Sequence, residues 1–232
     1  MWLVTDVSGE ELLPWIPQRI FCIGRNYAEH AHEMGHDPSI EPPFFFTKPL
    51  SALCSAQGNW HLPDFSSQVE HELELVIGLQ VPLNQGRHAN AEQASNWITA
   101  AALGIDMTCR DIQRAAKQAG QPWDIAKGFD TSAPLTPLLH LGKEGLETLG
   151  AMELSVNGTR RQVGNWHDML WLPGALIAHI SHYFALQSGD IIFTGTPAGV
   201  SPLKPGDHLR AHLDGLPHQI DLRINAAKFA QT

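Results

Sequence analysis

VEHELELVIG, residues 69–78, sets three carboxylates in strict alternation with other side chains and then becomes wholly apolar. Side chains two positions apart lie on one face of a β-strand, so Glu70, Glu72 and Glu74 are expected to share a face. Their Cα atoms would be roughly 6.5 to 7 Å apart, which lets two carboxylates reach one hard cation. The same alternation is typical of any half-buried strand with a solvated polar face. The stretch therefore predicts a strand and leaves a metal site and a solvated face equally open.

The composition is that of an ordinary globular protein. The chain has 232 residues, 43% of them hydrophobic, which is enough for a sizeable core in one or two domains. Its formal net charge of -9 argues against a nucleic-acid partner, because affinity for phosphates depends on Lys and Arg. Three scattered cysteines, Cys22, Cys54 and Cys109, predict free thiols rather than disulfides.

The chain carries no pattern of membrane insertion or export. No window reaches the roughly 18 consecutive apolar residues of a membrane span. Residues 1–20 lack the basic start and apolar core of a signal peptide. We therefore expect a cytoplasmic protein without a membrane partner.

Upstream of the opening stretch, residues 19–24 (RIFCIG) predict a buried strand and residues 26–35 a short helix. On this helix His30 and Glu33 are three positions apart and share a face, so Glu33 could orient His30 as a general base. A surface pair of histidine and glutamate is an equally good interpretation of the helix taken alone.

The same helix contains a second pattern, because His32, Glu33 and His36 match the HExxH string of zinc peptidases. That mechanism needs both histidines on one face of a continuous helix. Gly35 and Pro38 are expected to end the helix before His36 can take that position. The zinc peptidase is therefore a remote alternative.

Downstream, residues 90–103 predict a helix with a capping pair at its start, and residues 103–106 a short strand. Thr108 is expected to cap a second helix that ends at Gly120. Asp106 would then lie where a strand passes into a helix, which is a common position for a functional side chain and also for a turn residue.

Lys127 is expected in a loop or irregular strand over residues 121–130, with its ammonium either in solvent or directed toward an anion. Asn157-Gly158 is a strong β-hairpin signal. Two further strands are expected over residues 208–213 and 218–224. Strands outnumber helices and tight turns join several of them, so we expect a sheet-dominated α+β fold of mixed strands.

Seven segments stand in an order and spacing that resemble the fumarylacetoacetate hydrolase family, in its short acylpyruvate hydrolase branch. The resemblance runs from about Arg19 to the C-terminus. It implies a β-roll with a few flanking helices in one catalytic domain, residues 18–232, with residues 1–17 packed on its core, and a homodimer. The segments are GRNYAEHAHEMG, FFFTKP, VEHELELVIG, GIDMTCRDIQ, GQPWDIAKGFD, VNGTRRQ and GDIIFTGTPAGV.

The resemblance also implies residue roles. Its metal carboxylates correspond to Glu72, Glu74 and Asp106, whereas Glu70 has no matching ligand role. Its catalytic positions correspond to His30, Glu33 and Lys127, and its substrate-binding positions to Arg25, Gln113 and Thr196. Three carboxylates and waters make an all-oxygen site, which suits Mg²⁺, with Mn²⁺ or Ca²⁺ as alternatives.

The function that the resemblance implies is metal-dependent hydrolysis of the carbon-carbon bond of acylpyruvates, which are small anionic 2-oxo acids, to pyruvate and a carboxylic acid. His30, held by Glu33, would take a proton from water. Lys127 would stabilise the oxyanion or the substrate carboxylate. Oxaloacetate decarboxylation and keto-enol tautomerisation remain alternatives, because they use the same enolate.

Overall fold

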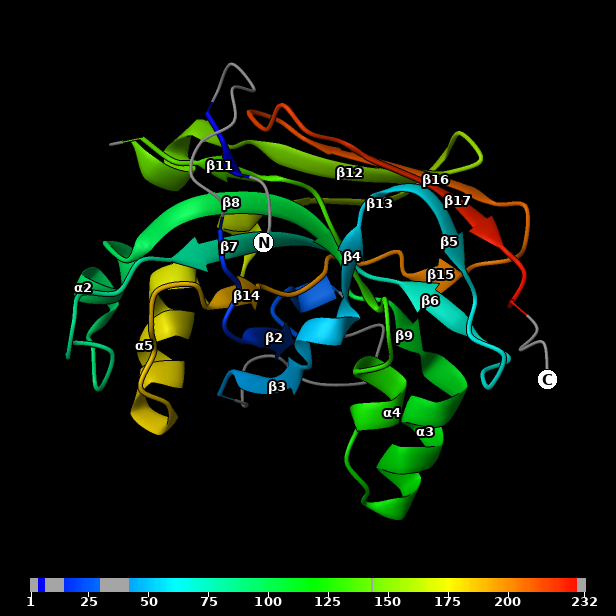
Figure 1. Ribbon diagram of the computed structural model, residues 1–232, viewed down its shortest axis with the longest axis horizontal. Helices are drawn as coiled ribbons and strands as arrows, with labels where there is room; N and C mark the ends of the chain where they lie inside the picture. The colour runs from blue at the N-terminus through cyan, green and yellow to red at the C-terminus, as the bar shows by residue number, and fades with distance from the viewer. Residues whose placement is uncertain (1–3, 7–14, 30–41, 143, 229–232) are drawn as a thin grey trace.

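The computed structural model describes residues 4–6, 15–29, 42–142 and 144–228. Two layers of β-sheet form the body of the molecule, and the helices lie at its edges (Figure 1). The sheet-dominated α+β fold of mixed strands expected from the sequence is confirmed. No helix in the described ranges is long and apolar enough to cross a membrane.

The larger sheet has nine strands and holds the opening stretch at its centre. Parallel pairing joins β14 to β2, while β7 pairs antiparallel with both β8 and β14. In spatial order the strands are β1 (Val4–Thr5), β11 (Leu138–His140), β8 (Ile98–Ile105), β7 (Leu73–Leu79), β14 (Ile191–Phe193), β2 (Ile20–Gly24) and β3 (Phe44–Lys48), with β4 (Leu53–Ser55) and β10 (Ala133–Leu135) beside them.

The second layer is a five-stranded sheet of β13 (Thr159–Asn165), β12 (Ala151–Val156), β16 (His208–Leu213), β17 (Ile220–Asn225) and β5 (Gln57–His61). The hairpin predicted at Asn157-Gly158 is confirmed between β12 and β13, with φ of 53° and 77° at its two residues. A third sheet is small and consists of β15 (Ser201–Pro202), β6 (Val69–His71) and β9 (Thr108–Cys109).

The main core lies between the two large sheets. Leu73, Leu75 and Ile77 on one face of β7 belong to the same buried cluster as Leu154 of β12 and Leu209 of β16. Burying a Leu or Ile side chain of this kind contributes about 1.5 to 3 kcal/mol. The other face of β7 is buried as well, since Val76 belongs to a second buried cluster. Burial of both faces explains why the sequence of the strand is continuously apolar after Glu74.

The helices are short. In the described ranges they are α2 (Ala91–Ser95), α3 (Arg110–Ala119), α4 (Asp124–Lys127) and α5 (Pro173–Tyr183), with 3-10 turns η1 (Leu50–Ala52), η2 (Gly145–Thr148) and η3 (Trp166–Asp168). In Figure 1, α3 and α4 project together from one end of the molecule, and α2 and α5 pack at the other. The lobe of α3 and α4 carries several residues of the site described below.

The helix predicted over residues 90–103 is wrong beyond its first turns. The capping pair of Asn90 and Gln93 is confirmed, but α2 ends at Ser95 and residues 98–105 form β8. Ala100, Ala101 and Ala102 are fully buried between β7 and β11. Burial in a central strand therefore overrides the helix propensity of alanine, because small side chains fit between closely packed layers.

Two local predictions after β8 also differ from the structure. Thr108 does not cap the second helix, since it lies in β9 and its hydroxyl donates to the Asp106 carbonyl. The helix α3 begins at Arg110 and ends at Ala119, and Gly120 terminates it as expected, with a left-handed φ of 63°. Lys127 lies in the short helix α4 and not in a loop.

Candidate functional site

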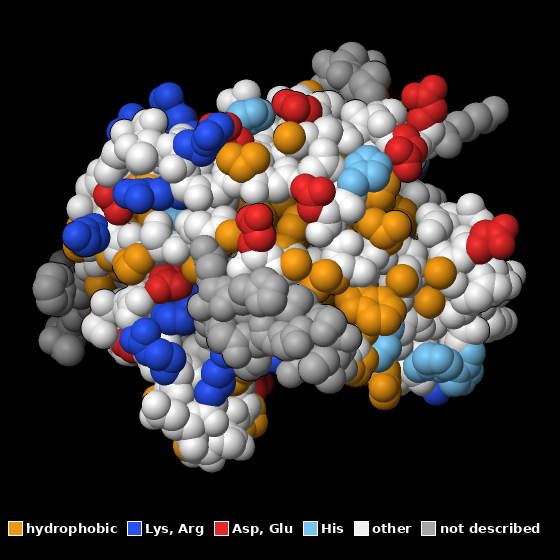
Figure 2. Space-filling model, turned by 180° about the vertical axis from the view of Figure 1, so that it is seen from behind, with side chains coloured by type: hydrophobic (Ala, Val, Ile, Leu, Met, Phe, Trp, Pro, Cys, Tyr) orange, Lys and Arg blue, Asp and Glu red, His pale blue; other side chains and the backbone are white. Residues whose placement is uncertain are grey.

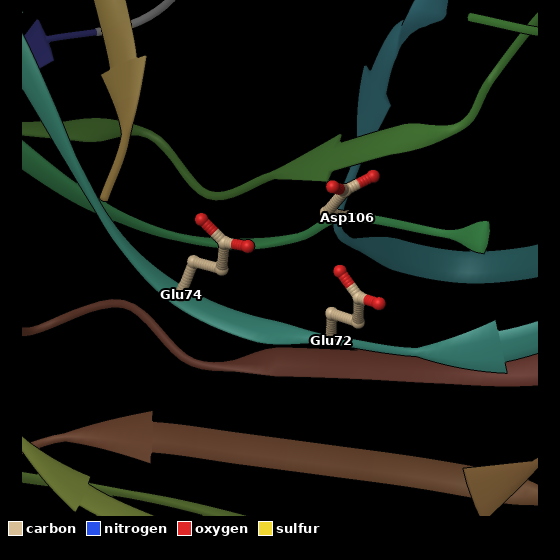
Figure 3. A group of neighbouring side chains, drawn as sticks. All are labelled: Glu72, Glu74 and Asp106. Atoms are coloured by element: carbon tan, nitrogen blue, oxygen red, sulfur yellow. The ribbon is translucent and has the colours of Figure 1, made fainter. Parts of the chain in front are cut away.

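Three buried carboxylates meet where two central strands of the large sheet, β7 and β8, begin and end. Figure 3 shows Glu72 and Glu74 on the β6–β7 segment with Asp106 from the end of β8 beside them. One oxygen from each of the three lies within 4.8 Å of the others. Each residue is less than a tenth exposed. This group is the candidate metal site.

The pairing of β7 with β8 brings Asp106 to this position. Leu73 faces Ile105, the last residue of β8, in the antiparallel register, so Asp106, the residue after it, falls opposite Glu72. The backbone N–H of Asp106 donates to the Glu72 carbonyl at 2.8 Å and holds the two ends together. Thirty-odd residues of sequence separate these carboxylates, so their meeting depends on the register of one strand pair.

Three cations compensate the negative charge of the site. Lys127 Nζ donates to Glu72 Oε2 at 2.7 Å and to Asp106 Oδ2 at 2.6 Å. Arg110 Nη2 donates to Glu72 Oε1 at 2.5 Å, and Lys48 Nζ lies 2.8 Å from Asp106 Oδ1. Buried carboxylates are costly unless they are paired in this way.

The charge of Glu74 is stabilised by a backbone hydrogen bond, in contrast to the ion pairs of Glu72 and Asp106. No ion pair to Glu74 is found in the described part of the chain, and its Oε2 accepts a 2.7 Å hydrogen bond from Gly195 N. The pKa of Glu74 is raised well above its usual value by burial and by the charges of Asp106 and Glu72. A further positive charge would therefore be stabilised next to Glu74.

The donor set fits a hard divalent cation. All three candidate ligands are carboxylates, which Mg²⁺, Mn²⁺ and Ca²⁺ accept. Asp106 Oδ1 forms an ion pair with Lys48 Nζ at 2.8 Å, and no other cation or hydrogen-bond donor to this oxygen is found among the described residues. A buried carboxylate oxygen with an unused lone pair is what an incoming cation needs.

Glu70 takes part in the network that supports these carboxylates. Its Oε2 accepts from Arg110 Nε at 2.7 Å, and its Oε1 accepts from Gln68 Nε2 at 2.7 Å. Arg110 therefore bridges Glu70 and Glu72, and Glu70 is not part of the three-carboxylate group. Its position on the acidic face is explained by the guanidinium that it orients.

A cavity opens next to the carboxylates, and it is lined by all the substrate-binding residues predicted from the sequence. Arg25, Gln113 and Thr196 contribute to its wall together with Lys127. The backbone of Arg25 is left-handed, with a φ of 59°, and its guanidinium lies 5.2 Å from the centre of the Phe44 ring. The structure therefore brings these four residues to one cavity beside Glu72 and Glu74.

Thr196 is held by a buried glutamine. Gln162 Nε2 donates to Thr196 Oγ1 at 2.7 Å and to the Pro197 carbonyl at 2.9 Å. Gln162 Oε1 lies 2.8 Å from His71 Nδ1 and accepts a 3.0 Å hydrogen bond from Leu73 N. One side chain thus ties the loop of Thr196 to the strand segment that carries the carboxylates.

The predicted dyad of His30 and Glu33 lies outside the described residues, as do His32 and His36 of the zinc peptidase alternative. Their roles stay predictions.

Sequence reasoning did not single out three residues of this network, Lys48, Arg110 and Gln162. Arg110 could have been found, because it follows Asp106 by four residues at the start of a helix. Lys48 and Gln162 give no local signal, since their partners are at least 34 residues away in the sequence.

The sequence model of the fumarylacetoacetate (FAA) hydrolase C-terminal domain matches residues 19–221. The oxaloacetate tautomerase YcgM of Escherichia coli is 38% identical over 214 residues, which cover 92% of this chain and 95% of that protein. A mitochondrial oxaloacetate decarboxylase of Dictyostelium discoideum is 40% identical over 204 residues, covering 86% of this chain and 90% of that protein.

Solved structures show the same similarity. Fumarylpyruvate hydrolase from Pseudomonas aeruginosa, in complex with Mn²⁺ and pyruvate, superimposes with a TM-score of 0.89 at 34% sequence identity. The match covers 97% of this chain and 95% of that one.

Proposed function

Because the chain belongs to the fumarylacetoacetate hydrolase family, we propose that it is a divalent-metal-dependent enzyme that cleaves acylpyruvates into pyruvate and a carboxylic acid. The observation that carries the proposal is the buried group of Glu72, Glu74 and Asp106 at the end of a cavity with cationic walls. Such a cavity suits a small anionic 2-oxo acid.

In this proposal Glu72, Glu74 and Asp106 hold Mg²⁺, or Mn²⁺ or Ca²⁺ in its place. The ion would supply Lewis-acid stabilisation of the negative charge that develops on the 2-oxo oxygen as the carbon-carbon bond breaks, an effect worth several kcal/mol. Lys127, already 2.7 Å from Glu72, would stabilise an oxyanion that forms beside the carboxylates. Arg25, Gln113 and Thr196 would orient the substrate.

His30, oriented by Glu33, would take a proton from water in this mechanism. The resulting hydroxide adds to the acyl carbonyl, and the bond between that carbon and the pyruvate methylene breaks. Its electron pair passes to the enolate of pyruvate, which takes up a proton. A positioned general base typically contributes about 10²- to 10⁴-fold to the rate.

The proposal is tested by measuring pyruvate release from acetylpyruvate. Chelator treatment should abolish release and added Mg²⁺ should restore it. The His30→Ala variant should keep metal binding but lose hydrolysis. Hydrolysis that is indifferent to the chelator would contradict the metal site, and full activity of His30→Ala would contradict the dyad.

A second candidate is keto-enol tautomerisation of oxaloacetate, which the name of the Escherichia coli relative favours. Tautomerisation moves one proton between carbon and oxygen and needs no attacking water. His30→Ala should then leave carboxylate-dependent enol conversion less affected than hydrolysis. Following the ultraviolet absorbance of enol-oxaloacetate beside pyruvate release distinguishes the two reactions.

A further inference from the structure

Cationic side chains outnumber carboxylates in the described part of the cavity wall. Its described part contains four cationic side chains, Arg25, Arg110, Lys117 and Lys127, and two carboxylates, Glu72 and Glu74. In Figure 2, Lys and Arg side chains gather where the lobe of α3 and α4 joins the body of the molecule. A bound divalent cation would add to this positive charge.

Lys117 differs from Arg110 and Lys127 in its ion pairs. Arg110 and Lys127 are both engaged by Glu72, whereas no ion pair to Lys117 is found within the described ranges. The pKa of Lys117 is lowered by partial burial and by the charges of Arg25 and Arg110. A negative group brought by a ligand would relieve this repulsion.

The helix α3 sets the distance between the carboxylates and Lys117. Arg110, Gln113 and Lys117 follow one face of α3, at spacings of three and four residues, and all three line the cavity. Arg110 contacts Glu72 at the start of the helix. At 1.5 Å per residue, Lys117 lies about 10 Å farther along the helix axis.

Aromatic rings contact the cationic side chains at the end of the cavity that lies away from the carboxylates. Lys117 Nζ lies 5.3 Å from the centre of the Trp123 ring, within the range of a cation–π contact. Trp123 meets Phe44 edge to face, with 5.3 Å between ring centres, and Phe44 lies under Arg25. The two rings offer an apolar wall to a carbon chain that runs from the carboxylates toward Lys117.

We propose that Lys117 is a specificity-determining residue that selects 2-oxo acids with a second carboxylate at the far end of the carbon chain. The proposal rests on the proposed function, because it places the 2-oxo acid end of the substrate beside Glu72, Glu74 and Asp106. The chain lies along Phe44 and Trp123, and the distal carboxylate receives a charge-assisted hydrogen bond from Lys117.

The test compares two substrates that differ only at the far end. Fumarylpyruvate ends in a carboxylate, and crotonylpyruvate has a methyl group in its place. Lys117→Gln should lower kcat/KM for fumarylpyruvate by about 10-fold or more, as expected for loss of a charged hydrogen bond. The same variant should change kcat/KM for crotonylpyruvate less than about twofold, and Lys117→Arg should retain the preference.

Arg114→Gln is the matched control. It removes a positive charge from the same helix, but Arg114 donates a hydrogen bond to Gln68 and does not line the cavity. This variant should leave the ratio of the two kcat/KM values unchanged. Equal losses for both substrates in Lys117→Gln, or an unchanged ratio, would overturn the proposal.

A binding measurement separates this inference from the proposed function. Absence of turnover for both substrates would contradict the proposed hydrolysis only. Calorimetric titration with 2-oxoheptanedioate and 2-oxoheptanoate, which have the seven-carbon length of fumarylpyruvate and also differ by a terminal carboxylate and methyl, still tests Lys117. Preference for the diacid in the wild type and its loss in Lys117→Gln would support the proposal, and equal binding of the two acids by the wild type would overturn it.

Discussion

At the scale of single residues, the site is a balance of buried charges. Lys127, Arg110 and Lys48 stabilise Glu72 and Asp106, whereas among the described residues Glu74 accepts a hydrogen bond from one backbone N–H. Removing one partner of a buried ion pair typically costs about 3 to 5 kcal/mol, because the remaining charge stays buried. The arrangement therefore constrains both metal binding and stability.

A first prediction concerns Gln162, which is fully buried and uses both ends of its amide. Gln162→Leu would leave the Leu73 N–H without its acceptor and free the Thr196 hydroxyl. We expect a loss of about 1 to 3 kcal/mol in the free energy of unfolding, measured by urea denaturation.

The exposed Gln118 on α3 provides the control. Gln118→Leu should change the free energy of unfolding by less than about 0.5 kcal/mol. If Gln162→Leu is equally tolerated, the hydrogen bonds of Gln162 contribute nothing to the fold.

At this scale the sequence predicted part of the site. The period of two along the opening stretch placed Glu72 and Glu74 on one face, and the family resemblance added Asp106. The period could not show that Glu70 orients Arg110, or that Lys48 comes to Asp106 from another strand. Those contacts depend on how strands that are distant in the sequence pair and pack.

At the scale of elements, β8 shows where local pattern fails. Its alanines favour a helix by propensity, but the strand is hydrogen-bonded to β7 on one side and to β11 on the other. By contrast, the hairpin at Asn157-Gly158 was predictable, because the turn itself requires left-handed backbone at two successive residues. Strand identity in a buried sheet depends on neighbours that the local sequence does not contain.

A second prediction tests the packing at Gly104 of β8, which lies opposite Glu74. A Cβ atom there would be 2.6 Å from the Phe193 ring and 2.8 Å from Val76 Cγ2. Gly104→Ala should therefore destabilise the protein by about 1 to 3 kcal/mol through overpacking.

Thermal or urea unfolding measures this loss, with Gly142→Ala as the control. A Cβ at Gly142 meets nothing within 4 Å, so that variant should be nearly neutral. A stable Gly104→Ala variant would mean that β8 has room that the structure does not show.

At the scale of the whole molecule, the two large sheets lie as layers over the main core (Figure 1). The site lies where β7 begins and β8 ends. The pairing of β7 with β8 brings the three carboxylates together. The lobe of α3 and α4 contributes the cavity residues Arg110, Gln113, Lys117 and Lys127. The homodimer expected from the family resemblance stays a prediction, which light scattering in solution would test.

A third prediction is that a divalent cation stabilises the whole fold. A ligand that binds only the native state at 100 times its dissociation constant adds about 2.7 kcal/mol to the free energy of unfolding. For a chain of this length that corresponds to a rise in Tm of about 5 to 10 °C. Differential scanning calorimetry of chelator-treated protein, with and without Mn²⁺, measures the rise.

An unchanged Tm at saturating Mn²⁺ would contradict a native metal site. The same scan of Asp106→Asn serves as the control, because weaker binding should give it a clearly smaller rise in Tm at the same Mn²⁺ concentration.

The measurement that tests the central claim most directly is calorimetric titration of Mn²⁺ into metal-free protein. The wild type should bind one ion per chain, and Asp106→Asn should bind it at least about 10-fold more weakly, since an acidic ligand is lost. Glu70→Gln removes a carboxylate from the same acidic face outside the three-carboxylate group, so its affinity should stay much closer to that of the wild type. Equal affinities of the wild type and Asp106→Asn, or equal losses in Asp106→Asn and Glu70→Gln, would contradict the assignment of Glu72, Glu74 and Asp106 as the metal site.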